Sequence, residues 1–480
     1  MSDPDVLVAG AGPAGLLLAA ELALAGVRTT VVERLPERPP YCRGFNLNAR
    51  ALDLLARRGL AEGLVAEGHR VPHAPATGLR GPLLLDRTAT DHPFSLGIPQ
   101  TRVEEVLEAR ALELGAEILR GHDLRSFTQS ADDVTTVVHN GRFGRTIRSR
   151  FLVGCDGGRS TVRKQAGIDF PGVDARWYAL LGDVECDLPY GPSAGPDGRS
   201  LFVIPRPGYV RIVVREDDPP SDKNTPVTLE RLQAQVDAVL GRHVELRAPR
   251  WLSRFGDAAR LASSYREGRV LLAGDAAHIH PPASANGVNV ALDDAFNLGW
   301  KLAATVRGTA PEGLLDTYHD ERHAAGSRIL ANTRAQVALE EQATEPWADL
   351  LRRVAAHPAG NRALAEIITG LDACYEPGGH AWLGRLVPDM PLRVSGAETH
   401  LAALLHTGRP VLVDLTGAFA AWSAGVEVLA ASSPSTSDVE AVLLRPDGHA
   451  AWVGTNGSGD AGLAEAVHRW VGDVPVPASA

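Results

Sequence analysis

A glycine-rich turn near the start of the chain joins a short apolar strand to a helix. Residues Val6 to Ala9 are apolar, and the helical stretch Leu16 to Leu24 follows; Gly10-x-Gly12-x-x-Gly15 lies between them. In this context the first glycine permits a tight turn, the second lets a pyrophosphate approach the backbone, and the third lets the helix pack closely on the strand. The start of the helix also offers free N–H groups to phosphate. The segment therefore predicts a dinucleotide-binding fold.

An acidic residue stands where such a fold holds its ribose. Residues Val27 to Val32 predict the second strand, and Glu33 closes it, about 20 residues after the glycines. A carboxylate there accepts hydrogen bonds from ribose hydroxyls and repels a 2′-phosphate, so adenosine with a free 2′-hydroxyl is favoured. The alternative is a glycine-rich turn in an unrelated α/β protein.

A second apolar strand, much later in the chain, also ends at a glycine and an acid. Residues Val270 to Ala273 precede Gly274-Asp275, whose carboxylate offers acceptors to the hydroxyls of a ribityl chain. The corner Pro281-Pro282 then leads into a helix whose first N–H groups are suited to the pyrimidine edge of an isoalloxazine. By itself this segment also fits an ordinary connection with Asp275 as a cap. Taken with the first segment, it predicts FAD and hence redox chemistry.

Composition narrows the class of protein. A chain of 480 residues is long enough for two or three domains, and 44% hydrophobic residues suffice for large cores. A net charge of −10 without a long basic run argues against nucleic acid and anionic membranes. The four cysteines form no CxxC pair, so we expect free thiols and no zinc site. No stretch has the length of a membrane span, and the first strand leaves no room for a signal peptide. A cytoplasmic protein is predicted.

The pattern of strands and helices divides the chain into four segments. Half-buried strands with Pro-Gly breaks, Tyr178 to Val184, Ser200 to Ile204 and Tyr209 to Arg215, predict an antiparallel sheet inserted in the nucleotide-binding domain. Helices are predicted at Thr101 to Leu114, Ala291 to Val306, Leu314 to Thr333 and Trp347 to Ala355. Strands at Pro410 to Leu415, Val426 to Ala430, Ala441 to Leu444 and Ala450 to Trp452, with a helix Leu463 to Val471, predict a small C-terminal unit. The predicted segments are residues 1–171 and 263–387 (FAD-binding domain), 172–262 (substrate-binding sheet domain) and 388–480 (C-terminal domain).

Three motifs together resemble one family, the single-component (group A) FAD-dependent aromatic hydroxylases with the fold of para-hydroxybenzoate hydroxylase. Gly10-x-Gly12-x-x-Gly15 with Glu33 is similar to the family's first FAD motif, Cys155-Asp156-Gly157-Gly158 to its DG motif, and Gly274-Asp275 to its ribityl motif. The resemblance covers nearly the whole chain. It implies an α/β fold: a Rossmann-like FAD-binding domain, an inserted substrate-binding sheet and a thioredoxin-like C-terminal domain. The closest groups are the phenol and polyketide hydroxylases.

The resemblance also implies an activity. NADPH or NADH reduces FAD, O₂ adds to the flavin, and the resulting hydroperoxide hydroxylates a phenolic or polycyclic aromatic substrate, as in antibiotic biosynthesis. No metal, nucleic acid or membrane partner is implied, and a monomer or homodimer is expected. Arg43 and Arg50 fall in the segment that lines the pyrophosphate, and Gln100 and Arg102 open the helix that covers the dinucleotide. No catalytic residue is identified. The residues predicted to contact FAD are Gly10, Gly12, Pro13, Ala14, Gly15, Glu33, Arg34, Arg43, Gln100, Arg102, Asp156, Asp275, Pro282, Ala285, Asn286, Gly287, Val288 and Asn289.

The chain departs from the family pattern in the loop before the late helix. Hydroxylases of polycyclic polyketides usually carry Gly-Gly-Gln-Gly where this chain has Ser284-Ala285-Asn286-Gly287. Two lost glycines predict a stiffer loop. Asn46 also stands at a position often held by glycine. Backbone N–H donors remain, so FAD binding is still expected, while the substrate assignment is less defined.

Several alternatives stay open. Baeyer–Villiger or epoxidising oxygen insertion uses the same fold, as does reduction of isoprenoid double bonds, and a flavin-binding sensor without turnover is a further possibility. A halogenase is disfavoured because Trp-x-Trp-x-Ile-Pro is absent. The C-terminal unit, marked by Leu444-Arg445-Pro446-Asp447-Gly448 and Trp452 but lacking CxxC, is expected to be structural. His278 and His280 are also interpreted as structural. Candidates to line a substrate pocket in the inserted sheet are Trp177, Phe202, Tyr209 and Arg211. The alternative is that these residues form plain core.

Overall fold

A computed structural model of the chain separates into two compact units. The first comprises Met1–Pro171 and Leu261–Ala480, and the second Gly172–Arg260. The finer division of the first unit into FAD-binding and C-terminal domains stays a prediction. The structure describes residues 3–76, 78, 79, 81–196, 199–342, 344–422, 425–434, 438–455, 457 and 459–472.

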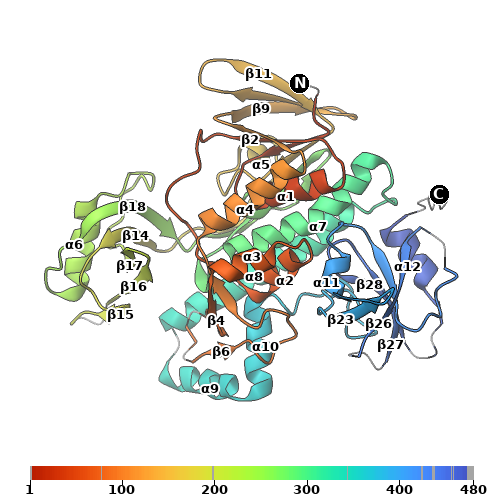
Figure 1. Cartoon of the computed structure of the whole chain (residues 1–480). Coiled ribbons are helices and arrows are strands. Elements are labelled where there is room, and N and C mark those ends of the chain that lie inside the picture. Colours follow the sequence, from red (N-terminus) through yellow and green to blue (C-terminus); the bar gives the residue numbers. More distant parts are fainter. Residues whose placement is uncertain are drawn as a thin grey trace. The chain divides into compact units, whose positions relative to one another are not determined.

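The first unit contains a six-stranded sheet, which is found near the label β2 in Figure 1. Its order is β20-β21-β12-β1-β2-β8, and all neighbours are parallel except the edge pair β20-β21. Every residue of β1, β12 and β21 is buried. Parallel strands covered on both faces read as continuous apolar runs, which explains why the sequence shows no alternation there. The strands are β1 Val6–Ala9, β2 Thr29–Glu33, β8 Glu117–Arg120, β12 Phe151–Gly154, β20 Arg266–Glu267 and β21 Val270–Leu272.

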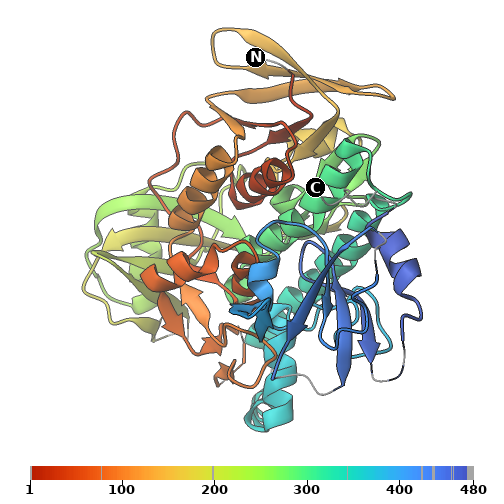
Figure 2. The ribbon, with the colours of Figure 1, turned by 45° about the vertical axis from the view of Figure 1, so that its right-hand side comes forward.

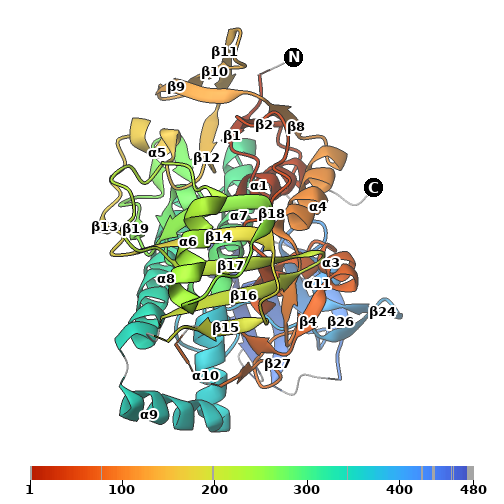
Figure 3. The same cartoon turned by 90° about the vertical axis from the view of Figure 1, so that its left-hand side faces the viewer.

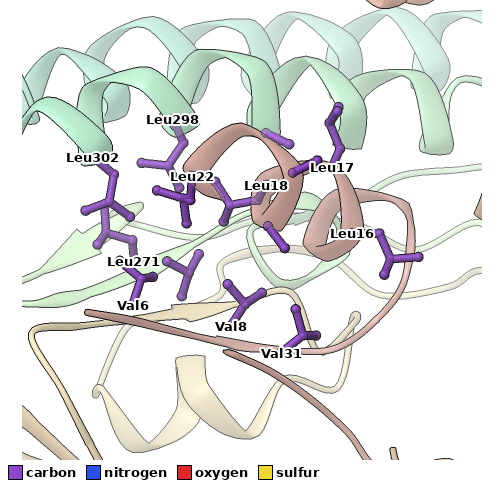
Figure 4. Close-up of a cluster of buried hydrophobic side chains, with 14 of the residues drawn as sticks. Val6, Val8, Leu16, Leu17, Leu18, Leu22, Val31, Leu271, Leu298 and Leu302 are labelled. Atoms are coloured by element: carbon purple, nitrogen blue, oxygen red, sulfur yellow. The ribbon is translucent and has the colours of Figure 1, made fainter. Parts of the chain in front are cut away.

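Helix α1 (Pro13–Leu24) is the centre of the core beside this sheet. It packs against both α4 (Gln100–Glu113) and α7 (Gly287–Arg307). Figure 4 shows Leu17, Leu18 and Leu22 of α1 between the strands and α7. A helix with buried side chains around its circumference is stabilised by tertiary packing and not by an amphipathic stripe. Its first turn is therefore held in a fixed position at the end of β1.

Smaller elements complete the first unit. Two short sheets and a long hairpin sheet were not predicted as such: β3-β7-β4 (Asn46–Leu47, Ser95–Gly97, His69–Val71), β5-β6 (His73–Ala74, Leu83–Leu84) and β11-β10-β9 (Gly144–Ser149, Val134–His139, Asp123–Gln129). The remaining helices are α2 Ala49–Ala56, α3 Ala61–Glu67, α5 Thr161–Gln165, α8 Asp316–Gln342, α9 Glu345–Ala356 and α10 Pro358–Thr369. Two 3₁₀ turns, Gly274–Ala276 and Ala283–Ala285, flank β22 (His278–Ile279). None of the helices in the described ranges is both long and apolar enough to cross a bilayer.

The second unit is an antiparallel sheet with a helix on one face. Helix α6 (Leu229–Leu240) covers the strands, as Figure 3 shows. Phe202, Tyr209 and Arg211 alternate with core residues and so lie on the face away from α6, outside its hydrophobic core. The predicted antiparallel insert is thus present. The sheet order is β15-β16-β17-β14-β18, and its strands are β14 Tyr178–Glu185, β15 Gly191–Ala194, β16 Ser200–Arg206, β17 Tyr209–Arg215 and β18 Arg247–Gly256. Two short strands outside this sheet, β13 Gly172–Val173 and β19 Ala259–Leu261, pair with each other.

The C-terminal part of the first unit has its own six-stranded sheet (Figure 2, blue). Its order is β24-β23-β26-β25-β27-β28, with β25 parallel to β26 and antiparallel to β27. The four predicted strands and the closing helix α12 (Leu463–Trp470) are present, and two further strands extend one edge. The elements are β23 Pro391–Val394, β24 Ala397–His400, α11 Leu401–Leu404, β25 Val411–Asp414, β26 Glu427–Ser432, β27 Val439–Leu444 and β28 Ala450–Thr455.

Candidate functional site

The first glycine turn is packed so closely that two of its glycines cannot be replaced without movement. Gly10 has φ +106°, and a Cβ atom there would lie 2.3 Å from the carbonyl oxygen of Cys155. A Cβ at Gly15 would lie 2.0 Å from the carbonyl oxygen of Gly10. Gly12 differs, because a Cβ there would meet no protein atom within 4 Å. Two glycines thus join strand to helix, and the third borders open space at the start of α1.

Glu33 lies directly beneath this turn. Its Oε2 accepts from the N–H of Ala11 and its Oε1 from the N–H of Leu35, both at 2.9 Å. A carboxylate has about four acceptor positions, so lone pairs remain for ribose hydroxyls. Glu33 therefore fixes the turn and keeps acceptor capacity at the end of β2.

The late Gly-Asp corner meets the first turn in space. Gly274 has φ +63°, and a Cβ there would lie 3.2 Å from Cβ of Ala14 and 3.3 Å from Cβ of Ala291. Ala14 is the second residue of α1, and Ala291 is the fifth residue of α7. Asp275 is exposed beside them. The beginnings of both helices and the Gly274-Asp275 corner therefore form one site, although the sequence separates them widely.

The DG motif adds a third wall to the site. Asp156 Oδ2 accepts from the N–H groups of Thr161 and Val162, at 2.7 and 3.1 Å. Its other carboxylate oxygen, Oδ1, is buried and has no hydrogen-bond partner within the part of the chain that the structure describes. Arg163 donates to the carbonyls of Gly158 and Ala276, at 3.0 and 2.8 Å, and so ties this motif to the Gly274 corner.

The donor chemistry of the site suits an extended anion such as FAD. Neither α1 nor α7 is capped by a side chain at its N-terminus. Each opens at a glycine, Gly12 or Gly287, where a Cβ would meet nothing within 4 Å. Uncapped helix starts present free N–H groups and a partial positive charge, which favour phosphate and an electron-rich flavin edge. The residues present fit this cofactor.

The loop before α7 has a backbone that usually requires glycine. Ser284 (φ +59°) and Ala285 (φ +51°) both lie in the left-handed region, at the two positions where the family pattern has glycines. The Ser284 hydroxyl donates to Oε1 of Gln336 (2.5 Å), and both residues are buried. Asn289 Nδ2 donates to the carbonyl of Ala285 (3.1 Å). The chain thus keeps the glycine backbone shape and holds it with side-chain hydrogen bonds.

This geometry predicts that Ala285→Gly stabilises the protein. Left-handed backbone costs a non-glycine residue about 1–2 kcal/mol, while added freedom in the unfolded chain offsets about 0.4–1 kcal/mol. We therefore expect a free energy of unfolding about 0.5–1 kcal/mol higher than in the wild type, measured by urea unfolding. A decrease would show that the Ala285 backbone is not strained. Ala291→Gly, at a helical position of α7, is the control and is expected to destabilise.

A cluster of asparagines fixes the same loop from the other side. Asn289 Oδ1 accepts from the N–H of Asn48 (2.9 Å), and Asn286 Nδ2 donates to the carbonyl of Ile368 (2.9 Å). Asn48 Nδ2 lies 3.3 Å from Oδ1 of Asn286. Asn286 and Asn289 were predicted to contact FAD. In the structure their side chains hold the loop. Their backbone N–H groups, at the start of α7, are therefore the donors that remain for FAD.

The remaining residues predicted to bind FAD occupy different environments, and some of them are paired with other protein groups. Gln100 approaches Gly44, where a Cβ would lie 2.9 Å from its Oε1. Arg102 pairs with Glu67 and Glu105 on the exposed side of α4. The sequence also placed Arg50 near the pyrophosphate, but its guanidinium is buried against Asp293. Arg34, Arg43 and Pro282 are exposed, whereas Pro13, Gly287 and Val288 are half-buried at the helix starts.

Sequence reasoning missed the residue that holds the Gly274 corner. Asp294 of α7 is fully buried, and its Oδ2 accepts from the N–H of Gly274 (2.9 Å) and lies 2.7 Å from Nε2 of His278. Its Oδ1 accepts from Nε of Arg322 (2.8 Å). Burial opposes the charge, yet His278 and Arg322 keep the pKa of Asp294 lowered. This buried contact is consistent with the structural role expected for His278, which stays a prediction. The signal in the sequence was the pair Asp293-Asp294 within an apolar helix.

Comparison with known proteins decides the family. Residues 3–333 match the model of an FAD binding domain, and residues 380–474 match that of the C-terminal domain of aromatic-ring hydroxylases. The chain belongs to the FAD-dependent aromatic-ring hydroxylases. It is an FAD-dependent monooxygenase, as its sequence motifs predicted.

Relatives of this aromatic-ring hydroxylase cover nearly its whole length. A 12-dehydrotetracycline 5-monooxygenase/anhydrotetracycline 6-monooxygenase from Streptomyces rimosus is 41% identical, over 98% of this chain and 99% of the relative. A dialkyldecalin synthase from Streptomyces rugosporus is 40% identical, over 98% and 99%. The solved structure of an anhydrotetracycline hydroxylase from Streptomyces rimosus has a TM-score of 0.92 and 41% identity, covering 99% of this chain and 100% of that one.

The position of Glu33 gives a direct test of the adenosine end of the site. We expect Glu33→Ala to weaken FAD binding at least tenfold, because the turn loses its support and the ribose loses its acceptor. Glu33→Gln keeps one side-chain acceptor, so its affinity for FAD should lie between those of the wild type and Glu33→Ala. The dissociation constant is measured by titrating apoprotein with FAD and following the flavin fluorescence. Unchanged affinity in Glu33→Ala would remove Glu33 from the site.

Proposed function

We propose that the chain hydroxylates a polycyclic aromatic of the polyketide type. The observation that carries this proposal is the meeting of α1, α7 and the Gly274-Asp275 corner at one place. That geometry supports one extended FAD, and the relative from Streptomyces rimosus, alike over its full length, is named for tetracycline-type substrates. NADPH or NADH and O₂ are the proposed co-substrates.

When bound, FAD supplies the redox chemistry, because it accepts hydride from NADPH or NADH and activates O₂. Glu33 is proposed to hold the ribose, the first turn of α1 the pyrophosphate, and Asp275 the ribityl hydroxyls. The first N–H groups of α7 are proposed to face the pyrimidine edge and to stabilise negative charge there. Burial lowers the pKa of His280, which favours the neutral imidazole beside the Pro281 carbonyl.

The inserted sheet is proposed to hold the substrate on its face away from α6. Arg211 and Asp183 form a buried ion pair on this face, at 2.7 and 2.8 Å. The Arg211 guanidinium lies 5.1 Å from the centre of the Trp251 ring. Phe202, 48% exposed, belongs to the same face. Aromatic rings beside a fixed guanidinium suit a flat phenolic ring system.

The test uses the purified holoprotein with a panel of monocyclic phenols and anthracycline- or tetracycline-like polycycles under ¹⁸O₂. We expect a polycycle to accelerate NAD(P)H oxidation and its product to carry ¹⁸O. A monocyclic phenol as the best substrate would overturn the substrate class. Turnover of a polycycle without ¹⁸O or NAD(P)H consumption would indicate ring formation, which the name of the dialkyldecalin synthase suggests for that relative.

We also propose that the enzyme acts in the cytoplasm as a monomer or homodimer. Cys155, Cys186 and Cys374 form no disulfide among the described residues, which suits a reducing compartment. Burial raises the pKa of the Cys155 thiol, so it stays protonated beside the glycine turn. Light scattering of the purified protein decides between the two oligomeric states.

A further inference from the structure

We propose that the C-terminal domain positions the FAD corner through one continuous chain of buried ion pairs, which the neutral His449 joins by hydrogen bonds at the junction between the two domains. The inference rests on the assignment of Gly274-Asp275 to FAD. It gives the C-terminal domain a role in cofactor affinity that is separate from packing. In this view Asp294, Arg322, Asp293, Arg50 and His449 are positioning residues.

The first half of the chain of ion pairs starts at the FAD corner. Asp294 accepts from the N–H of Gly274 and from Nε of Arg322, at 2.9 and 2.8 Å. Arg322 also donates through Nη1 to Oδ2 of Asp293 (2.7 Å). The same Asp293 accepts from Nε and Nη2 of Arg50, at 3.0 and 3.2 Å. Helices α7, α8 and α2 are thereby linked without a gap.

The second half lies in and beneath the C-terminal domain. His449 Nδ1 is 3.0 Å from Oδ1 of Asp447, and Arg445 Nη2 donates to Oδ2 of Asp447 (2.6 Å). Arg445 returns to the FAD-binding domain by donating through Nη1 and Nη2 to Glu321, at 2.6 and 2.9 Å. Lys301 Nζ donates to Glu321 Oε2 (2.8 Å). Both ends of the motif Arg445-Pro446-Asp447-Gly448-His449 thus contact the FAD-binding domain: Arg445 contacts Glu321, and His449 contacts Arg50.

The charges of this chain of ion pairs balance. Its cations are Arg50, Lys301, Arg322 and Arg445, its anions are Asp293, Asp294, Glu321 and Asp447, and each side chain is at most 10% exposed. Buried charges are stable only while each keeps a partner. Loss of one link therefore leaves a neighbour uncompensated, and that neighbour must find a new partner or draw in water. We expect a change at His449 to shift Arg50 and thereby Asp293. Asp293 is next in sequence to Asp294, the residue that holds Gly274.

His449 is held neutral in a defined tautomer. Arg50 Nη2 lies 3.1 Å from His449 Nε2, and a guanidinium only donates, so Nε2 accepts and Nδ1–H donates to Asp447. Burial lowers the pKa of His449, although Asp447 opposes this shift. The charged and titratable groups around the ring come from α2 (Arg50), α7 (Asp293), its own turn (Asp447, Arg445) and the segment before β23, where the Tyr375 ring centre is 4.7 Å away.

The experiment compares FAD affinity with stability in matched variants of the full chain. His449→Phe keeps the ring packing and removes both hydrogen bonds, while Arg445→Lys keeps the charge and loses the paired contacts to Glu321. Leu412→Ala is the control, because Leu412 is fully buried in the C-terminal core and outside the ion pairs. Apoprotein is titrated with FAD at pH 7.0 and at a series of lower pH values at which the protein stays folded, and the unfolding midpoint of each apoprotein is recorded. Both His449→Phe and Arg445→Lys should weaken FAD binding at pH 7.0, about tenfold and about threefold.

The control and the pH series separate positioning from general stability. Leu412→Ala should lower the unfolding midpoint and leave the FAD dissociation constant within twofold of the wild type. The wild type should bind FAD more weakly once the pH falls below the lowered pKa of His449, since a proton on Nε2 displaces Arg50, and His449→Phe should lose this dependence. Wild-type affinity in His449→Phe, or equal losses in Leu412→Ala, would overturn the inference; if His449→Phe does not fold, Arg445→Lys decides by the same criteria. A wild type that binds no FAD would overturn the cofactor assignment instead.

Discussion

Gly15→Ala is expected to destabilise the apoprotein by about 3 kcal/mol and to abolish stable FAD binding. The new Cβ would lie 2.0 Å from the carbonyl oxygen of Gly10 and 3.3 Å from Cβ of Cys155. The nearest atom is backbone in a turn that is itself packed against Cys155, so relief requires helix α1 to move away from β1. Overpacking of this kind typically costs about 1–3 kcal/mol, and a backbone clash lies at the upper end. Urea unfolding of the apoprotein measures the loss.

Gly12→Ala is the matched control for this prediction. A Cβ at Gly12 meets nothing within 4 Å, and its φ of −83° is ordinary for alanine. The stability of the apoprotein should therefore stay within about 0.5 kcal/mol of the wild type. FAD affinity should nevertheless fall at least tenfold, because the methyl group occupies the approach of the pyrophosphate. A Gly12→Ala protein that binds FAD normally would contradict the proposed position of the phosphates.

Asp294→Ala is expected to have the second large effect, a loss of about 3–5 kcal/mol in the free energy of unfolding. The carboxylate is fully buried, and its removal leaves Gly274 N–H, His278 and Arg322 short of an acceptor. Removing one partner of a buried ion pair typically costs about this much. Asp316→Ala is the control: Asp316 also pairs with an arginine, Arg266, but it is 70% exposed, so its loss should cost less than about 1 kcal/mol.

The pH dependence of this difference has a defined sign. Because the pKa of Asp294 is lowered in the folded protein, its contribution is complete above the ordinary value of 3.8 and is lost as the pH falls below it. The stability gap between wild type and Asp294→Ala should therefore be constant from pH 7 to about 5 and narrow in more acidic buffer. A gap that widens on acidification would contradict the ion-pair assignment.

The parts of the fold that the sequence predicted are those written in local patterns. The first glycine turn is an example, since Gly10 and Gly15 are required by contacts within the strand–turn–helix unit itself. The inserted sheet was predicted because its strands alternate apolar and polar residues, for example over Tyr209–Arg215. The joint position of Gly12 and Gly274 was predicted only through the chemistry of a shared cofactor. The structure supports it with an independent contact, Ala14 against Gly274.

The parts that escaped prediction depend on pairing between distant residues. Asp294, Arg322 and His449 are ordinary polar residues in sequence. Only the fold shows that Asp294 and Arg322 form a buried ion pair and that His449 is hydrogen-bonded to Arg50. Arg50 was assigned to the pyrophosphate because of its position along the chain, but the choice between ligand and ion pair depends on Asp293, far away in sequence. The left-handed backbone of Ser284 is likewise fixed by a contact with Gln336 that no local pattern records.

The order of the central sheet has a consequence for biosynthesis. Strand β1 pairs with β12, and β12 with β21, so neighbours come from residues near 6, 151 and 270. At ribosomal speeds of about 5–20 residues per second, roughly 15–60 s pass between synthesis of Val6 and of Arg307, the last residue of α7. During this time β1 has been made, but β21, which pairs with β12 in the same sheet, and α7, which packs against α1, are still incomplete. We therefore expect FAD to bind only after the Gly274-Asp275 corner and α7 have been synthesised.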